Sequence, residues 1–163
     1  GDWSSDVCSS DLSPFNAFLL LLGVETLPLR MQRHSENGMA VAEFLSRHPM
    51  VDWVRYPGLS SHPRHAVATR YHERGLYGAM IGFGPVGGRD AARRVVERCR
   101  LLSHLANIGD EKSLIIHPAS TTHSQLTARE LEAAGISEDF LRLSVGLESQ
   151  ADLLADLDQA LTR

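Results

Sequence analysis

One stretch near the C-terminus, residues 141–148, reads Leu-Arg-Leu-Ser-Val-Gly-Leu-Glu. Apolar and polar residues alternate along its first five positions, which is the period of a strand with one buried face. The apolar residues therefore point to one side of the strand, while Arg142 and Ser144 point to the other. An arginine among apolar neighbours is costly unless it is paired. Arg142 is therefore either an ion-pair or surface arginine of ordinary kind, or a residue that binds an anionic group.

A second stretch, residues 104–123, reads His-Leu-Ala-Asn-Ile-Gly-Asp-Glu-Lys-Ser-Leu-Ile-Ile-His-Pro-Ala-Ser-Thr-Thr-His. Short strands are predicted around Leu105 and over 114–116, and they bracket a turn that Asn107 and Gly109 favour. The two histidines that follow lack a third ligand at a suitable spacing, so we predict no metal site. No serine or cysteine of the chain lies in a motif for an activated nucleophile.

Helical signals account for much of the remaining chain. Ser13-Pro14 is typical of an N-cap followed by proline at the first helical position. The helix that it begins is apolar on nearly all sides, so we expect it to be buried between other elements. Thr127 and Glu130 form a capping box. The predicted helices cover 14–25, 28–48, 62–73, 88–100, a segment from 127 to about 135, and a segment from 149 to the C-terminus.

The remaining predicted strands cover 51–56, 78–83 and 140–145. Glycines in the second of these suggest close packing against a neighbouring element. Helices thus alternate with short strands, which indicates an α/β or α+β fold. A length of 163 residues suits a single domain with a real core.

Composition narrows the class of protein. A hydrophobic content of 43% with 22% charged residues is ordinary for a globular domain. The net charge of −4 disfavours nucleic acid as a partner, because phosphate binding requires a basic surface. No apolar run reaches the roughly 18 residues that a membrane span needs. Cys8 and Cys99 lie far apart, so we predict a buried free thiol at Cys99 and a reducing, cytoplasmic location.

The first twelve residues differ from the rest. Residues 1–12 are rich in serine and aspartate and lack a starting methionine. We interpret them as an unrelated tail, either a translated adapter or assembly artefact of sequencing or a natural disordered tail. The predicted domain is therefore 13–163.

Residues 104–123 and 141–148 together resemble the C-terminal domain of the Cys/Met-metabolism family of pyridoxal-phosphate enzymes. Within that family they are most similar to the O-acetylhomoserine sulfhydrylase branch, and the resemblance runs from Ser13 to the C-terminus. It implies the small domain of a fold-type I transferase. Such a domain has a small, mostly antiparallel sheet with helices packed on it, preceded by long N-terminal helices.

The resemblance also implies roles for individual residues. Arg142 would grip the α-carboxylate of an amino-acid substrate, which a planar guanidinium binds bidentately. Asn107 stands where related enzymes often carry serine, and would approach the same carboxylate. Thr122 would lie near that carboxylate and help to order Arg142. Ala106 stands where some cystathionine-handling relatives carry an acidic residue, which favours a small nucleophile such as sulfide.

The implied cofactor is pyridoxal 5′-phosphate, whose Schiff base requires a lysine. Lys112 is the only lysine of the chain, lies in a charged run, and does not stand at the family position. In the family that lysine and the phosphate-binding turn lie upstream of the segment that begins here at Ser13. We therefore expect no catalytic, cofactor-binding or metal residue in this chain. We also expect the N-terminal cofactor domain to be absent and the chain alone to be inactive.

The implied reaction is γ-replacement, a transsulfuration step of methionine biosynthesis in which sulfide displaces acetate from O-acetylhomoserine to give homocysteine. The implied assembly is a homotetramer, so apolar surface is expected on this part of it. Cystathionine γ-synthase, γ-lyase or methionine γ-lyase activity remains an alternative within the family. A non-catalytic amino-acid-binding module that uses Arg142, and an inert structural fragment, remain alternatives outside it.

Overall fold

The computed structural model describes residues 12–162, so Cys8 and residues 1–11 of the predicted tail lie outside the described residues. The chain divides into two compact units, Gly1–Arg30 and Met31–Arg163, and each is considered by itself. Within the described residues, no helix combines the length and the apolar character needed to cross a bilayer.

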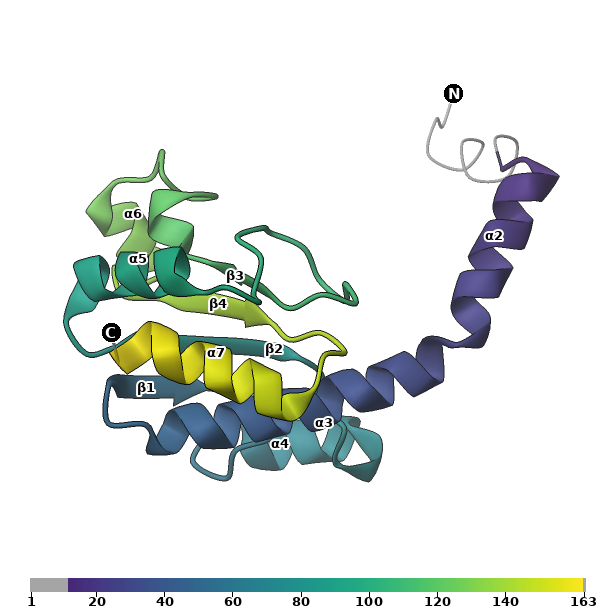
Figure 1. Ribbon diagram of the computed structural model, residues 1–163, viewed down its shortest axis with the longest axis horizontal. Coiled ribbons are helices and arrows are strands. Elements are labelled where there is room, and N and C mark those ends of the chain that lie inside the picture. The colour runs from purple at the N-terminus through teal and green to yellow at the C-terminus, as the bar shows by residue number, and fades with distance from the viewer. Residues whose placement is uncertain (1–11, 163) are drawn as a thin grey trace. The chain divides into compact units, whose positions relative to one another are not determined.

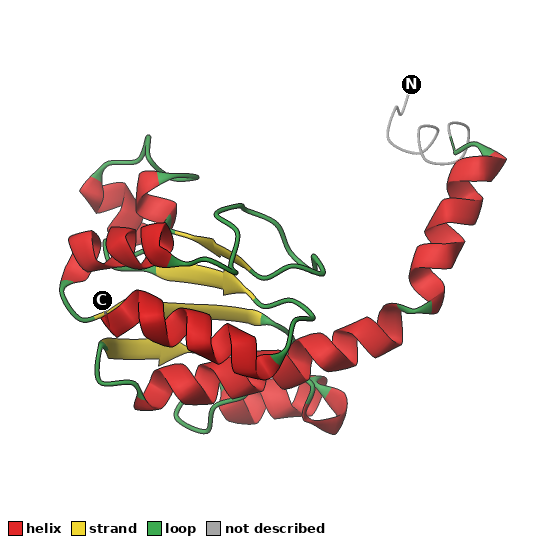
Figure 2. Cartoon of the chain, in the orientation of Figure 1, coloured by secondary structure: helices red, strands yellow, loops and turns green. Residues whose placement is uncertain are grey.

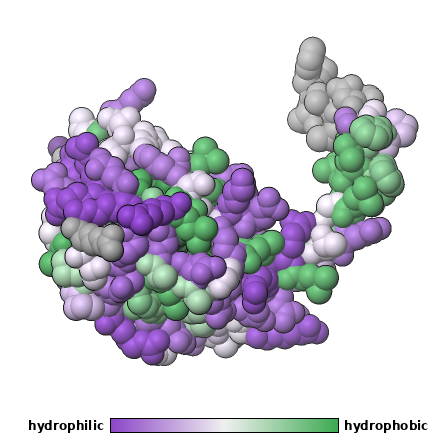
Figure 3. Space-filling view, viewed as in Figure 1, coloured by the Kyte–Doolittle hydropathy of each residue, from purple (hydrophilic) through white to green (hydrophobic). Residues whose placement is uncertain are grey.

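The first unit contains helix α2, Pro14–Glu25, with the bounds that the sequence predicts. Ser13 caps it by accepting a hydrogen bond of 3.2 Å from the Asn16 amide. The prediction that this helix is buried is wrong for this chain, because none of its residues is buried. Phe15 is 67% exposed and Leu21 64% exposed, and Figure 3 shows the helix as a hydrophobic surface. Its apolar side chains point in all directions, so burying them requires cover on several sides of the helix.

A four-stranded antiparallel sheet forms the centre of the second unit (Figures 1 and 2). Its strands lie in the order β1-β2-β4-β3. Their bounds are Val51–Arg55 for β1, Met80–Pro85 for β2, Leu114–Ile116 for β3 and Leu141–Ser144 for β4. The predicted small antiparallel sheet is thereby confirmed.

The strand predicted around Leu105 is not formed. In its place Ser103 makes an isolated parallel bridge to Leu114. The Leu105 amide bonds back to the Ser103 carbonyl at 2.9 Å, so the chain turns there before a ladder can extend. Leu105 is also 55% exposed, which leaves no buried face to select a strand register.

The predicted helices are confirmed, some with shorter bounds. They are α3 (Leu27–Arg47), α4 (His65–Tyr71), α5 (Gly88–Arg98), α6 (Ala128–Ala133) and α7 (Gln150–Thr162). Helix α4 starts later than predicted because the His62 ring accepts a hydrogen bond from the Arg64 amide in a preceding turn. The capping box of α6 is present, since Thr127 donates from its amide and its hydroxyl to Glu130 at 2.8 and 2.7 Å.

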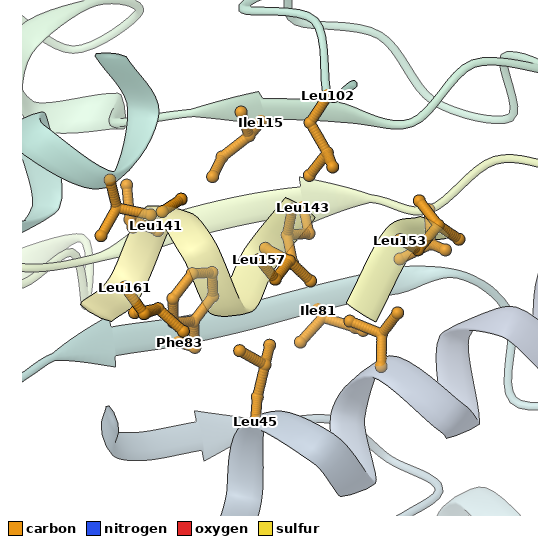
Figure 4. Close-up of a cluster of buried hydrophobic side chains, with 14 of the residues drawn as sticks. Leu45, Ile81, Phe83, Leu102, Ile115, Leu141, Leu143, Leu153, Leu157 and Leu161 are labelled. Carbon is orange, nitrogen blue, oxygen red and sulfur yellow. The ribbon is translucent and has the colours of Figure 1, made fainter. Parts of the chain in front are cut away.

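The two faces of strand β4 meet different surroundings. Leu141, Leu143 and Val145 are buried with side chains from α3, α5 and α7 in one apolar cluster (Figure 4). We call this side the helix-covered face. Residues Arg142 and Ser144 lie on the opposite side, which we call the arginine face. The alternation predicted from the sequence is therefore realised. The large apolar cluster lies on the helix-covered face, while Leu114 and Ile116, which pair with Ser144 and Arg142, are buried on the arginine face.

The link between α5 and β3 is tied to α7. The Asp156 carboxylate accepts from the backbone amides of Arg100, Leu101 and Leu102 at 2.9–3.2 Å. Cys99 precedes these residues and is a free thiol, as predicted, but it is half-buried against the apolar cluster where the sequence predicted a buried thiol. Burial raises the pKa of the Cys99 thiol to about 12, with a smaller contribution from the nearby Asp156 charge.

Candidate substrate-carboxylate site

Arg142 lies in the middle of the sheet on the arginine face. Its Cα pairs with Gly82 of β2 on one side and with Ile116 of β3 on the other. A Cβ at Gly82 would lie 2.7 Å from the Phe140 ring, so glycine is required there for close packing, as the sequence indicates. Two neighbouring strands therefore fix the backbone from which the Arg142 side chain projects.

The Arg142 guanidinium is only partly used by the protein. Its Nη2 donates to the Asn107 carbonyl oxygen at 3.1 Å. Among the described residues it makes no salt bridge with a carboxylate. A guanidinium carries several N–H donors in a planar fork, so this half-buried side chain retains donors for an anion. The geometry suits a carboxylate better than a spherical ion.

Asn107 contributes its backbone and not its amide to this contact. The Asn107 side chain donates to the Asp110 carboxylate at 3.2 Å and accepts from the Ile108 amide at 2.9 Å. Asp110 also accepts from the Lys112 amide at 3.1 Å, and Gly109 has a φ of +73°, which favours glycine. The side chains of this loop thus hold its conformation, and the loop presents the Asn107 carbonyl to Arg142.

The third predicted residue, Thr122, is not brought to Arg142 by any hydrogen bond among residues 12–162. It is exposed, and its hydroxyl bonds to the ring of the adjacent His123 at 2.8 Å. The role of Thr122 toward the substrate therefore stays a prediction. The structure brings together Arg142 and Asn107.

The histidine that opens this loop has a structural role. The His117 ring is buried, and its two nitrogens bond to the Ser120 hydroxyl at 2.8 Å and the Glu138 carbonyl at 2.7 Å. Residues 12–162 contain no group of three His, Cys, Asp or Glu side chains that could hold a metal ion.

Sequence reasoning missed three residues behind the site. The Glu148 carboxylate accepts from the Ser113 amide at 2.6 Å and from the Ser113 hydroxyl at 2.8 Å. The same hydroxyl accepts from the Gly146 amide at 2.7 Å. Gly146 and Glu148 close the motif that contains Arg142, so an acidic residue at the end of a binding motif was the available signal.

Lys112 does not suit a covalent bond to the cofactor. Lys112 is exposed, as predicted. A lysine that binds pyridoxal phosphate covalently needs a desolvated pocket. The unused donors of the Arg142 guanidinium suit a carboxylate.

The chain belongs to the family of Cys/Met metabolism PLP-dependent enzymes, whose model matches residues 3–162. An O-acetyl-L-homoserine sulfhydrylase of Leptospira meyeri is 58% identical over 150 residues, which cover 92% of this chain and 34% of the relative. A homocysteine synthase of Schizosaccharomyces pombe is 52% identical over 91% of this chain and 34% of its own length. The chain thus spans about a third of these relatives.

Solved structures agree with the fold. A protein provisionally assigned as an O-acetylhomoserine (thiol)-lyase of Campylobacter jejuni, which carries N'-pyridoxyl-lysine-5'-monophosphate, matches with a TM-score of 0.86 and 46% identity over 92% of this chain and 35% of that one. A cystathionine gamma synthase of Xanthomonas oryzae in complex with aminoacrylate and cysteine gives a TM-score of 0.84 and 47% identity over 92% of this chain and 38% of that one. The predicted small domain of a fold-type I pyridoxal-phosphate enzyme is confirmed.

Proposed function

We propose that this chain is the substrate-carboxylate-holding domain, residues 13–163, of a transferase that makes homocysteine from O-acetylhomoserine and sulfide. In this reaction acetate leaves the γ-carbon and sulfide takes its place. Pyridoxal phosphate, supplied with its lysine by a separate cofactor domain, provides the electron sink. The chain alone is then inactive.

One observation carries this proposal. Arg142 is a half-buried guanidinium at the centre of the sheet, oriented by the Asn107 carbonyl at 3.1 Å, and it forms no salt bridge among residues 12–162. A substrate carboxylate would complete its bonding. Holding that carboxylate orients the bond at the α-carbon for cleavage, and orientation of this kind lowers a barrier by several kcal/mol.

Sequence identity supports the O-acetylhomoserine sulfhydrylase branch of the family. Identity is 58% with an O-acetyl-L-homoserine sulfhydrylase, and 42% with an L-methionine gamma-lyase of Fusobacterium nucleatum. Position 106, where some cystathionine-handling relatives carry an acidic residue, holds alanine in this chain, which favours a small nucleophile such as sulfide over a second amino acid. Cystathionine γ-synthase activity is the second candidate, favoured by the likeness to the Xanthomonas oryzae structure.

The decisive experiment is Arg142→Ala in the enzyme that contains this domain. We expect kcat/KM for O-acetylhomoserine to fall. The fall should correspond to a loss of about 2–5 kcal/mol of transition-state stabilisation, as for the truncation of a bound charge pair. Arg142→Lys should recover only part of this loss, because an ammonium lacks the planar fork. The measurement is steady-state kinetics, with the exposed Arg93→Ala as a matched control.

An unchanged kcat/KM for Arg142→Ala contradicts the proposed role. Binding of free amino acids to the 163-residue chain by calorimetry, without cofactor, would instead support the amino-acid-binding module. Comparing O-acetylhomoserine with other γ-substituted amino acids, and sulfide with cysteine, separates the activities within the family.

We further propose a cytoplasmic location and assembly as a homotetramer. The free thiol of Cys99 fits a reducing compartment. The exposed apolar side chains of α2 are suited to cover by other parts of an assembly. Light scattering on the enzyme that contains this domain tests the assembly.

A further inference from the structure

We propose that Glu148 is a positioning residue for the carboxylate site. Through Ser113 it holds the Asn107 loop, residues 107–112, in the conformation that orients Arg142. The inference rests on the proposed function, because it concerns the same site. It adds a part of the machinery that does not touch the substrate.

The contact between Glu148 and Ser113 uses both carboxylate oxygens. One accepts from the Ser113 amide at 2.6 Å and the other from the Ser113 hydroxyl at 2.8 Å. Ser113 is fully buried and Glu148 is half-buried. A carboxylate withdrawn from water is stable only with such donors, and hydrogen bonds to a charged acceptor are the stronger kind. The Glu148 carboxylate therefore holds the end of the Asn107 loop through two strong hydrogen bonds to Ser113.

The turn that carries Glu148, residues 145–149, is itself bound closely to the loop. The Gly146 amide donates to the Ser113 hydroxyl at 2.7 Å, and the Leu147 amide donates to the Glu111 carbonyl at 2.8 Å. A Cβ at Gly146 would lie 2.6 Å from the Lys112 carbonyl carbon. Only glycine permits this approach of two backbones.

On its other side the turn is anchored to helix α3. The buried Asn37 amide donates to the carbonyl oxygens of Gly146 and Glu148, both at 2.9 Å. The His34 ring, one helical turn earlier, bonds to the Val145 carbonyl at 2.6 Å. Helix α3 therefore fixes the position of the turn, and Glu148 binds the loop to this fixed turn.

Loss of this fastening has a defined consequence. The loop runs from Ser113 back to Asn107, whose carbonyl is the acceptor that orients Arg142. Without Glu148, Ser113 itself is held, among residues 12–162, only by the bonds from the Gly146 and Ser103 amides, so the loop is loosened there. A loosened loop shifts the Asn107 carbonyl, and the guanidinium loses its fixed direction. Bidentate capture of a carboxylate depends on direction, so substrate affinity and orientation both fall.

The kinetic test uses Glu148→Ala, Glu148→Gln and Ser113→Ala in the enzyme that contains this domain. For Glu148→Ala we expect KM for the amino-acid substrate to rise roughly tenfold to a hundredfold, since two hydrogen bonds to a charged group are lost. KM for sulfide should not change, because sulfide has no carboxylate. Glu148→Gln keeps an acceptor for the Ser113 amide and should give an intermediate result. Glu97→Ala, which removes an exposed carboxylate from α5, is the matched control.

A second readout does not depend on activity. Hydrogen exchange on the 163-residue chain should show that the amides of residues 107–113 lose protection in Glu148→Ala, while β2 and β4 keep theirs. If Glu148→Ala does not fold, Glu148→Gln and Ser113→Ala decide by the same two readouts.

The inference is overturned if loop protection is unchanged, or if the KM values for amino acid and sulfide rise together, as expected of general destabilisation. Failure of the proposed function is a different result. In that case Arg142→Ala leaves the kinetics unchanged, while the exchange experiment still reports whether Glu148 holds the loop.

Discussion

The two faces of strand β4 share one backbone, but they differ in how fully the chain's own residues pack against them and bond to them. On the helix-covered face, Leu141 and Leu143 have no exposed surface and lie within the apolar cluster. On the arginine face, Arg142 is half-buried and donates one hydrogen bond, to a loop carbonyl. A face completed by the chain's own helices contributes stability. On the arginine face, the guanidinium keeps donors that the described residues do not use, and this is the observation on which the proposed binding role rests.

The largest effect that tests this comparison is a loss of stability on the helix-covered face. Leu143→Ala removes a fully buried side chain and should lower the free energy of unfolding by about 2–5 kcal/mol, from lost burial and a residual cavity. Arg142→Ala should lower it by less than about 1 kcal/mol, because one hydrogen bond is lost. Urea denaturation of the chain measures both.

A matched control for the leucine is Leu105→Ala, at a position 55% exposed, where a change within about 0.5 kcal/mol is expected. Equal losses for Leu143→Ala and Arg142→Ala would break the comparison. They would mean that the arginine supports the fold and not a ligand.

A second test concerns the hydrogen bonds by which Asp156 of α7 holds the segment that follows α5. Asp156→Ala leaves three backbone amides without their acceptor, including that of the buried Leu102, and should cost about 1–3 kcal/mol of unfolding free energy. Asp156→Asn keeps an acceptor oxygen and should cost less. Thermal unfolding of both variants measures the difference, and a neutral Asp156→Ala would show that these amides find water instead.

The smallest effect is expected at an exposed cap outside the core. Hydrogen bonds from Thr127, first from its amide and then from its hydroxyl, lower the pKa of the Glu130 carboxyl below its ordinary value. The capping contribution is therefore fully present above that ordinary pKa and is lost as the pH falls through the lowered value. An NMR titration should give Glu130 a lower pKa than in Thr127→Ala. Equal pKa values in the two proteins would show that the Thr127 hydroxyl does not bond to the Glu130 carboxylate.

Much of the fold follows from local patterns. Alternation over 141–145 and the leucine spacing after Ser149 place the strand and the last helix, since burial of one face imposes period 2 or 3.6. Two predictions, the strand at Leu105 and the burial of α2, were wrong for the same reason. Apolar character shows that a residue favours cover, while the packing of other elements decides whether cover is present.

The candidate site was predictable in part. The isolation of Arg142 in an apolar strand leaves an ordinary ion-pair arginine as an alternative, and it is the family resemblance that points to Arg142 and Asn107 as site residues. The contact itself uses the Asn107 carbonyl, which every residue possesses, so no side-chain pattern marks it. Ser113 and Glu148 were missed because they are 35 positions apart and meet only when the turn after β4 packs on the loop before β3.

The sequence by itself determined the period of each element, the caps of α2 and α6, the family, and the arginine that faces away from the core. These depend on local sterics and on the alternation of side chains along one backbone. Only the tertiary structure decided which loop carbonyl orients Arg142 and which carboxylate fastens that loop. Those contacts join residues distant in sequence, and their distances exist only after helix α3, the sheet and the loop have packed together.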